Sequence, residues 1–184
     1  QGILCGTSAD IIECDFGRIV CAICFDLNFD SLRSHYASLR PDLIVFSSMY
    51  HGGLAQQLWA YACRSYFVGA IAGPTVPSEI RNPFGEVIST STNYLNYTVA
   101  DINLDYCLAH LDLNWLKLDE LKKRYGSDVT IYDPGRIGSV LIQSNSEEMS
   151  ARDMAREFDV LLLDDYFRQC LEFHGRPENR EPSA

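Results

Sequence analysis

The first half of the chain alternates short apolar runs with amphipathic segments. The runs "RIVCAIC" at 18–24 and "LIVFSSM" at 43–49 show no regular polar alternation, which predicts strands buried on both faces of a sheet. Pro41 ends the helical pattern that lies between them. The elements predicted up to residue 72 are strands at 11–16, 18–24, 43–49 and 67–72 and helices at 29–39 and 54–66. Strand and helix in alternation indicate an α/β fold in which helices cover a sheet.

In the second half, turn and cap signals contribute as much as periodicity. Gly126 closes a helical pattern, and Ser150 with Asp153 resembles a capping box that opens another helix. The predicted elements are strands near 86–89 and at 97–105, a helix at 113–125, a β-rich stretch at 129–144 that Pro134-Gly135 breaks, and a last helix at 162–173. No repeat and no domain linker is visible. Residues 1–174 are therefore expected to form one domain, followed by a flexible polar tail at 175–184.

Composition and charge narrow the class of partner. With 47% hydrophobic and 22% charged residues among 184, the chain has the make-up of a globular domain. Its formal net charge of -10 argues against nucleic acid and against an anionic membrane surface, because both attract basic faces. No apolar run reaches the roughly 20 residues of a membrane-spanning helix, and no signal peptide is visible. We expect a cytoplasmic protein without nucleic-acid or membrane partners.

Seven cysteines, an odd number, indicate reduced thiols rather than a disulfide framework in a chain of this length. Buried strand thiols are expected at Cys5, Cys14, Cys21, Cys63, Cys107 and Cys170. Cys24 has three interpretations: a buried thiol, half of a Cys21-x-x-Cys24 redox pair, or a nucleophile. A redox pair should follow a strand and open a helix, whereas Cys21 lies within its predicted strand. Strand alternation would also send the two side chains toward opposite faces.

The position of Cys24 favours the third interpretation. Cys24 ends a predicted strand, and the segment "FDLNF" then turns the chain into a helix. A nucleophile on a strand-to-helix turn is exposed at the edge of a sheet, beside backbone N–H groups. The N–H of Phe25 is then placed to donate to a developing oxyanion. The turn follows the logic of a hydrolase nucleophile elbow, although the G-x-S-x-G pattern is absent.

The stretch "FGRIVCAICFDLNF" at 16–29 resembles the nucleophile segment of the nitrilase, or carbon–nitrogen hydrolase, superfamily, whose pattern is G-[KR]-I-x-x-x-I-C-[YF]-D. Similar segments follow in the family's order: "PDLIVFSSMYHGG", a helix with Trp59, "YFVGAIAG", "GEVIST" and "YTVADINLD". The resemblance covers 11–105. It implies part of a four-layer α-β-β-α sandwich, Cys24 as nucleophile and no cofactor. It also implies a homodimer or higher homo-oligomer, built on the helix after the cysteine and the helix of Trp59.

The resemblance further implies a substrate pocket at the end of the strand 43–49. The residues expected to line it are Asp26, Ser48, Met49, Tyr50 and His51. Asp26 has a second interpretation, in which it holds its turn through side-chain to backbone hydrogen bonds, and Asn28 is expected to cap the next helix. His51 paired with Cys24 would make a cysteine hydrolase of another kind. No two of the four histidines have metal-ligand spacing, so no metal site is expected.

Two catalytic groups of the family are missing. The family uses a glutamate as general base and a lysine that stabilises the tetrahedral intermediate, both well upstream of the cysteine, and many members add a glutamate on the helix of Trp59. Here that helix has no acid, and Glu13 is the sole upstream glutamate. The three lysines, Lys117, Lys122 and Lys123, lie on one predicted helix far downstream. We expect that the chain is the C-terminal part of a longer hydrolase and is inactive alone.

The sequence thus predicts an enzyme that cleaves an amide, nitrile or N-carbamoyl group of a small molecule through a cysteine thioester or thioimidate. The first alternative is a pseudoenzyme, or an oligomerisation or binding subunit of the same fold. A Cys-x-x-Cys redox protein is the second alternative.

Overall fold

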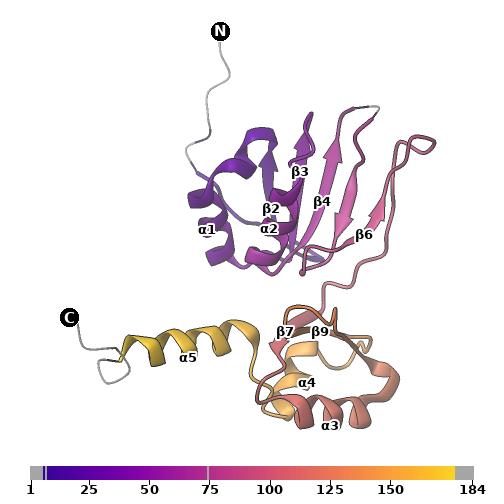
Figure 1. Cartoon of the computed structure of the whole chain (residues 1–184). Helices are drawn as coiled ribbons and strands as arrows, with labels where there is room; N and C mark the ends of the chain where they lie inside the picture. The colour runs from indigo at the N-terminus through magenta and orange to yellow at the C-terminus, as the bar shows by residue number, and fades with distance from the viewer. Residues whose placement is uncertain (1–5, 7, 74, 177–184) are drawn as a thin grey trace. The chain divides into compact units, whose positions relative to one another are not determined.

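The computed structural model describes residues 6, 8–73 and 75–176 (Figure 1). The chain forms two compact units, the first ending at Ile102 and the second beginning at Asn103, and each has its own sheet and buried core. The predicted tail at 175–184 lies outside the described residues from 177 onward, and the single domain expected over 1–174 stays a prediction. Within the described ranges, no helix is both long and apolar enough to cross a bilayer.

The first unit is a six-stranded mixed sheet with helices. Its strands are β1 (Ile12–Cys14), β2 (Gly17–Ile23), β3 (Leu43–Ser48), β4 (Tyr66–Ile71), β5 (Glu79–Arg81) and β6 (Val87–Thr90). Its helices are the 3-10 turn η1 (Cys24–Asn28), α1 (Asp30–Leu39) and α2 (Leu54–Cys63). The strand order is β1-β2-β3-β4-β5-β6, in which β2, β3 and β4 are parallel and the other pairs antiparallel. The predicted alternation of strand and helix is confirmed for this half.

Helices α1 and α2 cover one face of this sheet (Figure 1). Val20 of β2 faces them and is fully buried, together with Trp59 of α2. Alternate side chains of β2 point the other way: Cys21 is exposed, and Ile23 is 63% exposed. The prediction that 18–24 is buried on both faces is therefore wrong. Strand alternation sends every second side chain to the face that α1 and α2 do not cover.

The second unit is built around a three-stranded antiparallel sheet of order β7-β9-β8. Its elements are β7 (Tyr106–His110), α3 (Trp115–Tyr125), the 3-10 turn η2 (Gly126–Asp128), β8 (Val129–Tyr132), β9 (Ser139–Ser144), α4 (Ala151–Glu157) and α5 (Leu163–Gly175). Leu121 of α3 and Met154 of α4 are buried in its core. The predicted start of α4 is confirmed, because Ser150 Oγ accepts a hydrogen bond from Asp153 N at 3.1 Å.

Residues 97–105 form no strand, contrary to the prediction. Their alternating pattern is typical of a strand, but a strand also needs a neighbour whose backbone it can pair with. This segment instead runs to the boundary between the units, and Val99 is 76% exposed. Ser89 of β6 contacts Thr98 and Val99 through its side chain, but no strand pairing forms there, and the next strand along the chain, β7, begins only at Tyr106. The three-residue β5 was not predicted either, because it lies within the turn-rich passage at 73–86.

Asn114 ties together two loops of the second unit. It is fully buried, and its Nδ2 donates to His110 O and to Leu161 O, each at 2.8 Å. Its Oδ1 accepts from Leu161 N at 3.0 Å. Asn114→Ala removes all three bonds, so we expect the free energy of unfolding of this unit to fall by about 2–4 kcal/mol, measured by chemical denaturation. Asn145→Ala, at an exposed position with two hydrogen bonds of its own, is the matched control. Equal losses in the two variants would contradict this role of Asn114.

Candidate active site

Cys24 stands where β2 ends and η1 begins. Ile23 is in register with Ser47 of β3, and Ser47 with Ala70 of β4, so the carboxyl ends of the three parallel strands meet at one edge of the sheet. The backbone at Cys24 has a φ of 49°, in the left-handed region that non-glycine residues rarely adopt. Such a conformation costs on the order of 1–3 kcal/mol and persists only where its surroundings enforce it. The predicted strand-to-helix turn is confirmed, and its backbone is strained at the cysteine itself.

Two hydrogen bonds hold this turn from either side. Asp26 Oδ2 accepts from Ile23 N at 2.8 Å, which ties the end of β2 to the middle of η1. Trp59 Nε1 donates to Leu27 O at 3.0 Å, which ties η1 to α2 beneath it. Trp59 is fully buried and Leu27 nearly so, so the second bond is made inside the core. The interpretation of Asp26 as a turn-holding residue is thus supported by its contact.

Asn28 does not cap α1, contrary to the prediction. The residue before α1 is Phe29, and no side chain caps the helix there. Asn28 Nδ2 instead donates to Phe25 O at 3.0 Å and to Tyr50 Oη at 3.1 Å. Because η1 occupies 24–28, α1 does not follow β2 directly and begins only at Asp30. The bond to Tyr50 joins the cysteine turn, by which we mean residues 23–29 around η1, to the loop after β3.

The backbone N–H of Phe25 belongs to the first turn of η1. The first N–H groups of a helix have no acceptor within it, and they point out of its N-terminus. The Phe25 side chain is exposed and packs edge-on against Phe29, with ring centroids 5.7 Å apart. The direction of the Phe25 N–H is therefore set by the backbone of η1 and not by a contact of the Phe25 side chain.

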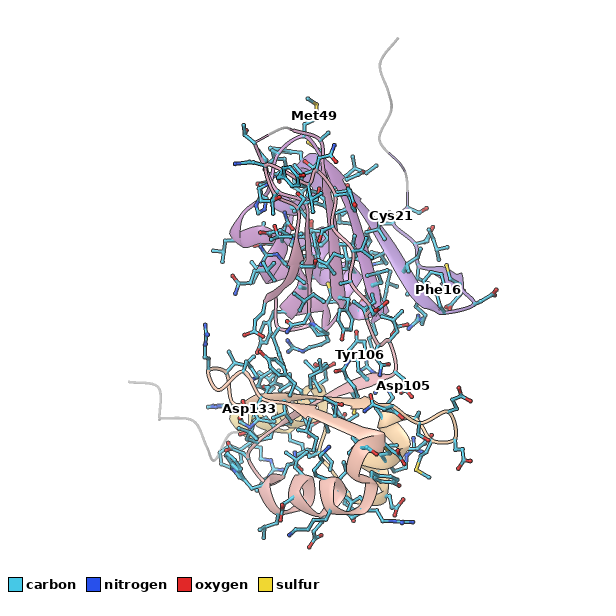
Figure 2. The ribbon with its side chains drawn as sticks, turned by 90° about the vertical axis from the view of Figure 1, so that its right-hand side faces the viewer. Phe16, Cys21, Met49, Asp105, Tyr106 and Asp133 are labelled. Carbon is cyan, nitrogen blue, oxygen red and sulfur yellow. The ribbon has the colours of Figure 1, made fainter. Side chains whose placement is uncertain are left out.

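The end of β3 and the loop after it contribute four of the pocket residues predicted from the sequence. Ser48 is buried, and its Oγ accepts from Tyr50 N at 2.9 Å, which fixes the loop as it leaves the sheet. Met49 is 79% exposed and projects from the tip of the first unit (Figure 2). Asn28 brings Tyr50 to the cysteine turn. His51 lies instead beside Glu79 of β5.

Both ring nitrogens of His51 already have neighbours. Its Nδ1 accepts from Gly53 N at 3.1 Å. His51 Nε2 lies 3.2 Å from Glu79 Oε2, and Glu79 also pairs with Arg81. His51 thus contacts Gly53 and Glu79, and its pairing with Cys24 as a base stays a prediction.

The cluster that His51 forms with Glu79 and Arg81 was not predicted from the sequence. Glu79 and Arg81 belong to β5, the strand hidden in the turn-rich passage, and both side chains are largely buried. Gln56 of α2 is fully buried beside Gly69 of β4, and a Cβ at Gly69 would lie 2.8 Å from Gln56 Oε1. The sequence shows these two charged residues, but only the pairing of β5 with β4 gives their place: Glu79 lies opposite Gly69, and Arg81 lies opposite Phe67, near the start of β4.

Burial distinguishes two of the remaining cysteines, Cys63 and Cys107, from Cys24, which is only partly buried. It raises the pKa of the Cys63 thiol to about 12 and that of the Cys107 thiol to about 12, which keeps both protonated and unreactive at neutral pH. The expectation of buried thiols holds for these two. It is wrong for Cys21, which is exposed on the uncovered face of β2, and Cys14 and Cys170 are only partly buried. Cys5 lies outside the described residues.

Glu13 and the three lysines have partners within their own units. Glu13 pairs with Arg18 at 3.2 Å at the start of β2, and six residues of extended chain, about 20 Å, separate Arg18 from Cys24. The ammonium groups of the three lysines are bonded within the second unit: Lys117 to Asp159 O, Lys122 to Gly126 O and Val129 O, and Lys123 to Asp119. Across the described residues, no group of three or more His, Cys, Asp or Glu side chains is arranged to hold a metal ion.

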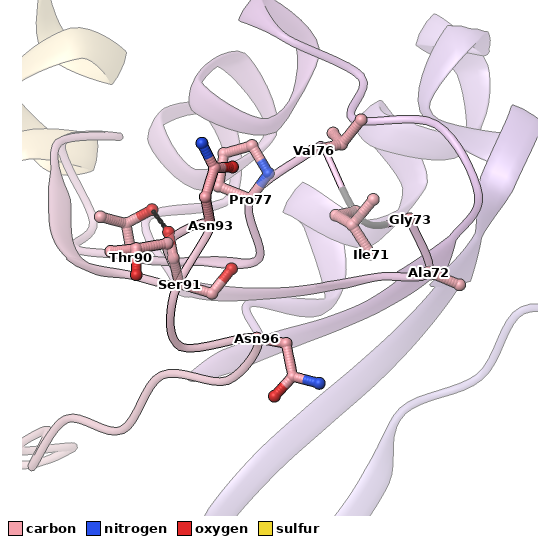
Figure 3. A pocket seen from close by; sticks show the side chains of 10 residues that line it. Ile71, Ala72, Gly73, Val76, Pro77, Thr90, Ser91, Asn93 and Asn96 are labelled. Atoms are coloured by element: carbon pink, nitrogen blue, oxygen red, sulfur yellow. Dashed lines mark hydrogen bonds between the residues drawn. The ribbon is translucent and has the colours of Figure 1, made fainter.

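A pocket of about 790 Å³ opens at the same edge of the sheet but beyond β4 (Figure 3). It is lined by Ile71, Ala72, Gly73, Val76, Pro77, Thr90, Ser91, Thr92, Asn93 and Asn96. None of the pocket residues predicted from the sequence lines it. The lining is uncharged, and side-chain amides and hydroxyls supply its polar groups.

The buried bond of Trp59 allows a direct test of what holds the cysteine turn. Trp59→Phe keeps an aromatic ring in the core but leaves Leu27 O without its donor. We expect the free energy of unfolding of the first unit to fall by about 1–3 kcal/mol, with faster amide exchange along η1. Trp115→Phe, at a side chain 64% exposed, is the matched control and should change stability by less than about 0.5 kcal/mol. Unchanged exchange along η1 in Trp59→Phe would show that this bond does not hold the turn.

Comparison with known proteins gives matches among solved structures alone, because no family model and no curated protein matches the chain. Nit3 of Saccharomyces cerevisiae, described as a member of branch 10 of the nitrilase superfamily, matches 48% of this chain and 38% of its own, with 16% identity and a TM-score of 0.44. NitN amidase from Nesterenkonia sp. AN1 matches 67% of this chain and 51% of its own, with 12% identity and a TM-score of 0.48.

XC1258 from Xanthomonas campestris, described as a CN-hydrolase superfamily protein with an arsenic adduct in its active site, matches 67% of this chain and 50% of its own, with 14% identity and a TM-score of 0.41. The chain spans about two fifths to one half of the length of these proteins. The chain is thus structurally similar, over about half to two thirds of its length, to members of the nitrilase, or CN-hydrolase, superfamily.

Proposed function

We propose that this chain carries the nucleophile of a carbon–nitrogen hydrolase that acts on a small amide, nitrile or N-carbamoyl compound. Cys24 Sγ attacks the carbon of the scissile group. With an amide, the C–N bond breaks, the amine leaves with a proton, and a thioester remains. With a nitrile, the first adduct is a thioimidate, which adds one water and expels ammonia to leave the same thioester. In both cases one further water hydrolyses the thioester, which releases the acid and returns the thiol.

The observation that carries this proposal is the left-handed backbone at Cys24. A strained non-glycine residue between a parallel strand and a helical turn is the geometry of a nucleophile elbow, which lifts its side chain out of the sheet edge. The surrounding bonds from Asp26 and Trp59 supply the constraint that such strain requires. A cysteine with only a packing role has no need of this conformation.

The group proposed to stabilise the developing oxyanion is a backbone N–H. The N–H of Phe25 lies one residue beyond the nucleophile, at the N-terminus of η1. A donor in that position stabilises the oxyanion of the tetrahedral intermediate as it forms. Asp26, Ser48, Met49, Tyr50 and His51 are the proposed lining of the substrate pocket on this edge.

The general base and the lysine of the proposed reaction come from polypeptide other than this chain. Its three lysines are bonded within the second unit, and Glu13 lies at the far end of β2. We therefore expect no turnover from the chain alone. These groups would need to reach the edge at Cys24 from a neighbouring layer.

The uncovered face of the first sheet gives such a layer a place. Ile23 is exposed there beside Cys21, whereas strands of parallel sheets are normally covered on both faces. A second sheet packed on this face would complete the four layers of an α-β-β-α sandwich. On the opposite side, exposed apolar residues of the cysteine turn and of α2, among them Phe29 and Leu54, offer a surface for a homodimer.

A pseudoenzyme of the same fold is the second candidate. It is favoured by one specific observation: no acidic residue occurs in α2, where a second glutamate would orient the lysine. Under this alternative the strain at Cys24 would be a remnant, and the protein would serve in assembly or binding.

The test is an assay of the full-length protein with simple amides, nitriles and N-carbamoyl compounds. We expect Cys24→Ala to lower kcat by at least about 1,000-fold without unfolding the protein, because the covalent step is lost. Cys14→Ala, at a partly buried cysteine in β1, is the matched control and should retain activity. Turnover that survives Cys24→Ala would exclude the nucleophile, and a folded but inactive full-length protein would favour the pseudoenzyme.

A further inference from the structure

The pocket beyond β4 (Figure 3) and Cys24 lie at the same edge of the first sheet. Ile23 of β2 is in register with Ser47 of β3, and Ser47 with Ala70 of β4. The pocket begins at the next residue of β4, Ile71. Neighbouring strands lie about 4.8 Å apart, so two steps across the sheet put about 10 Å between the cysteine and the pocket. One elongated compound can therefore reach both.

The two walls of the pocket, one after β4 and one after β6, are tied together through Ser78. Ile71 N donates to Ser78 Oγ at 2.9 Å, and Ser78 N donates to Ser91 Oγ at 2.8 Å. Ser91 N donates in turn to Ser78 O at 2.9 Å. The volume of about 790 Å³ lies within the range of roughly 300–1,000 Å³ that is typical of small-molecule sites.

The lining of this pocket combines apolar side chains with uncharged polar ones. Ile71, Val76 and Pro77 are apolar, and none of the lining residues carries a charge. Among the residues that the structure describes, the exposed amides of Asn93 and Asn96 have no hydrogen-bond partner. An amide both donates and accepts, as a hydroxyl does, whereas an ammonium only donates and a carboxylate only accepts. An uncharged group rich in hydroxyls therefore fits this lining.

We propose that the pocket binds the far end of the substrate, and that this end is an uncharged group with several hydroxyls, separated from the scissile C–N group by a spacer of about 10 Å. This inference rests on the proposed function, because it takes Cys24 as the reacting group. The spacer crosses the end of β3, where Met49 is 79% exposed, so an apolar chain suits it. Asn93 and Asn96 are then the residues that select the end group.

The first experiment measures kcat/KM of the full-length protein for four amides. Three are glycosides of ω-hydroxyoctanamide that differ only in the group at the end of the sugar: a neutral hydroxymethyl, an aminomethyl carried as ammonium, or a carboxylate. The fourth is octanamide. We expect the neutral glycoside to exceed each of the others by at least about tenfold. The two charged sugars meet no opposite charge in the lining, and octanamide has no hydroxyl to place there.

A charge placed in the pocket should change this preference. Asn93→Asp adds a carboxylate at an exposed lining position, so the ratio of kcat/KM between the ammonium and the carboxylate glycoside should rise by at least about tenfold. Gln57→Glu is the matched control. It adds the same charge to an exposed side chain of α2 that does not line the pocket, and it should leave the ratio unchanged.

The length of the spacer is tested with a shorter compound. The octanamide chain spans roughly 10 Å when extended, whereas a propanamide chain spans roughly 4 Å and cannot reach from Cys24 to the pocket. The neutral glycoside of ω-hydroxypropanamide should therefore gain nothing over propanamide in kcat/KM. An equal gain with both spacers would contradict the placement of the end group in this pocket.

The second experiment separates this inference from the proposed function, because it needs no turnover. Isothermal titration calorimetry measures binding of the neutral and the carboxylate glycoside of ω-hydroxyoctanamide to full-length Cys24→Ala. We expect the neutral compound to bind with a Kd at least about tenfold lower, and Asn93→Asp, added to Cys24→Ala, to weaken the carboxylate compound further. If no amide is hydrolysed but this binding pattern is found, the hydrolase is rejected and the ligand class of the pocket is upheld.

Equal Kd and kcat/KM values for the neutral and charged glycosides would overturn the inference. So would a preference that Asn93→Asp does not change, or an absence of binding by the neutral glycoside at millimolar concentration. Hydrolysis of octanamide that Cys24→Ala abolishes would, in each of these cases, leave the proposed function standing without this substrate class.

Discussion

The edge of the first sheet depends on one buried hydrogen bond, from the indole of Trp59 to the carbonyl oxygen of Leu27. This bond fixes the 3-10 turn to the helix beneath it, so that the chain cannot relax the left-handed backbone three residues earlier. Around it, the parallel strands bring the cysteine turn and the loop after β3 to the same edge, and Asn28 links the two through Tyr50. A strained cysteine at this point follows from packing and register together.

The sequence predicted this turn because its signals are local. An apolar run that ends in Cys24 and leads into "FDLNF" marks a change from strand to helix, and Ser150 marks the start of α4 in the same way. What was missed depends on pairing between distant segments. The segment 97–105 has the pattern of a strand but pairs with none, and β5 has too few residues for any pattern although it places Glu79 beside His51. Burial on both faces of β2 was predicted from apolar content, yet the described residues supply helices for one face alone.

Two apolar surfaces of this chain are therefore left uncovered, and they differ in kind. The face around Ile23 is broad and belongs to a sheet, so a second sheet suits it. The exposed side chains of Leu171 and Phe173 belong to one helix, α5, and form a narrower surface. Under the proposed function, a layer on the first surface would bring the missing catalytic groups toward Cys24. Both surfaces leave apolar side chains in water, at a cost of roughly 25 cal/mol for each Å².

The most direct measurement of the central claim is to trap the covalent intermediate. The full-length protein is quenched in acid during turnover of an amide substrate, and its peptides are mapped by mass spectrometry. The account predicts an acyl group on the peptide that contains Cys24, bound through sulfur and released by hydroxylamine. Steady turnover with an acyl group on any other residue, or with none on Cys24 under conditions in which hydrolysis of the intermediate limits the rate, would contradict it.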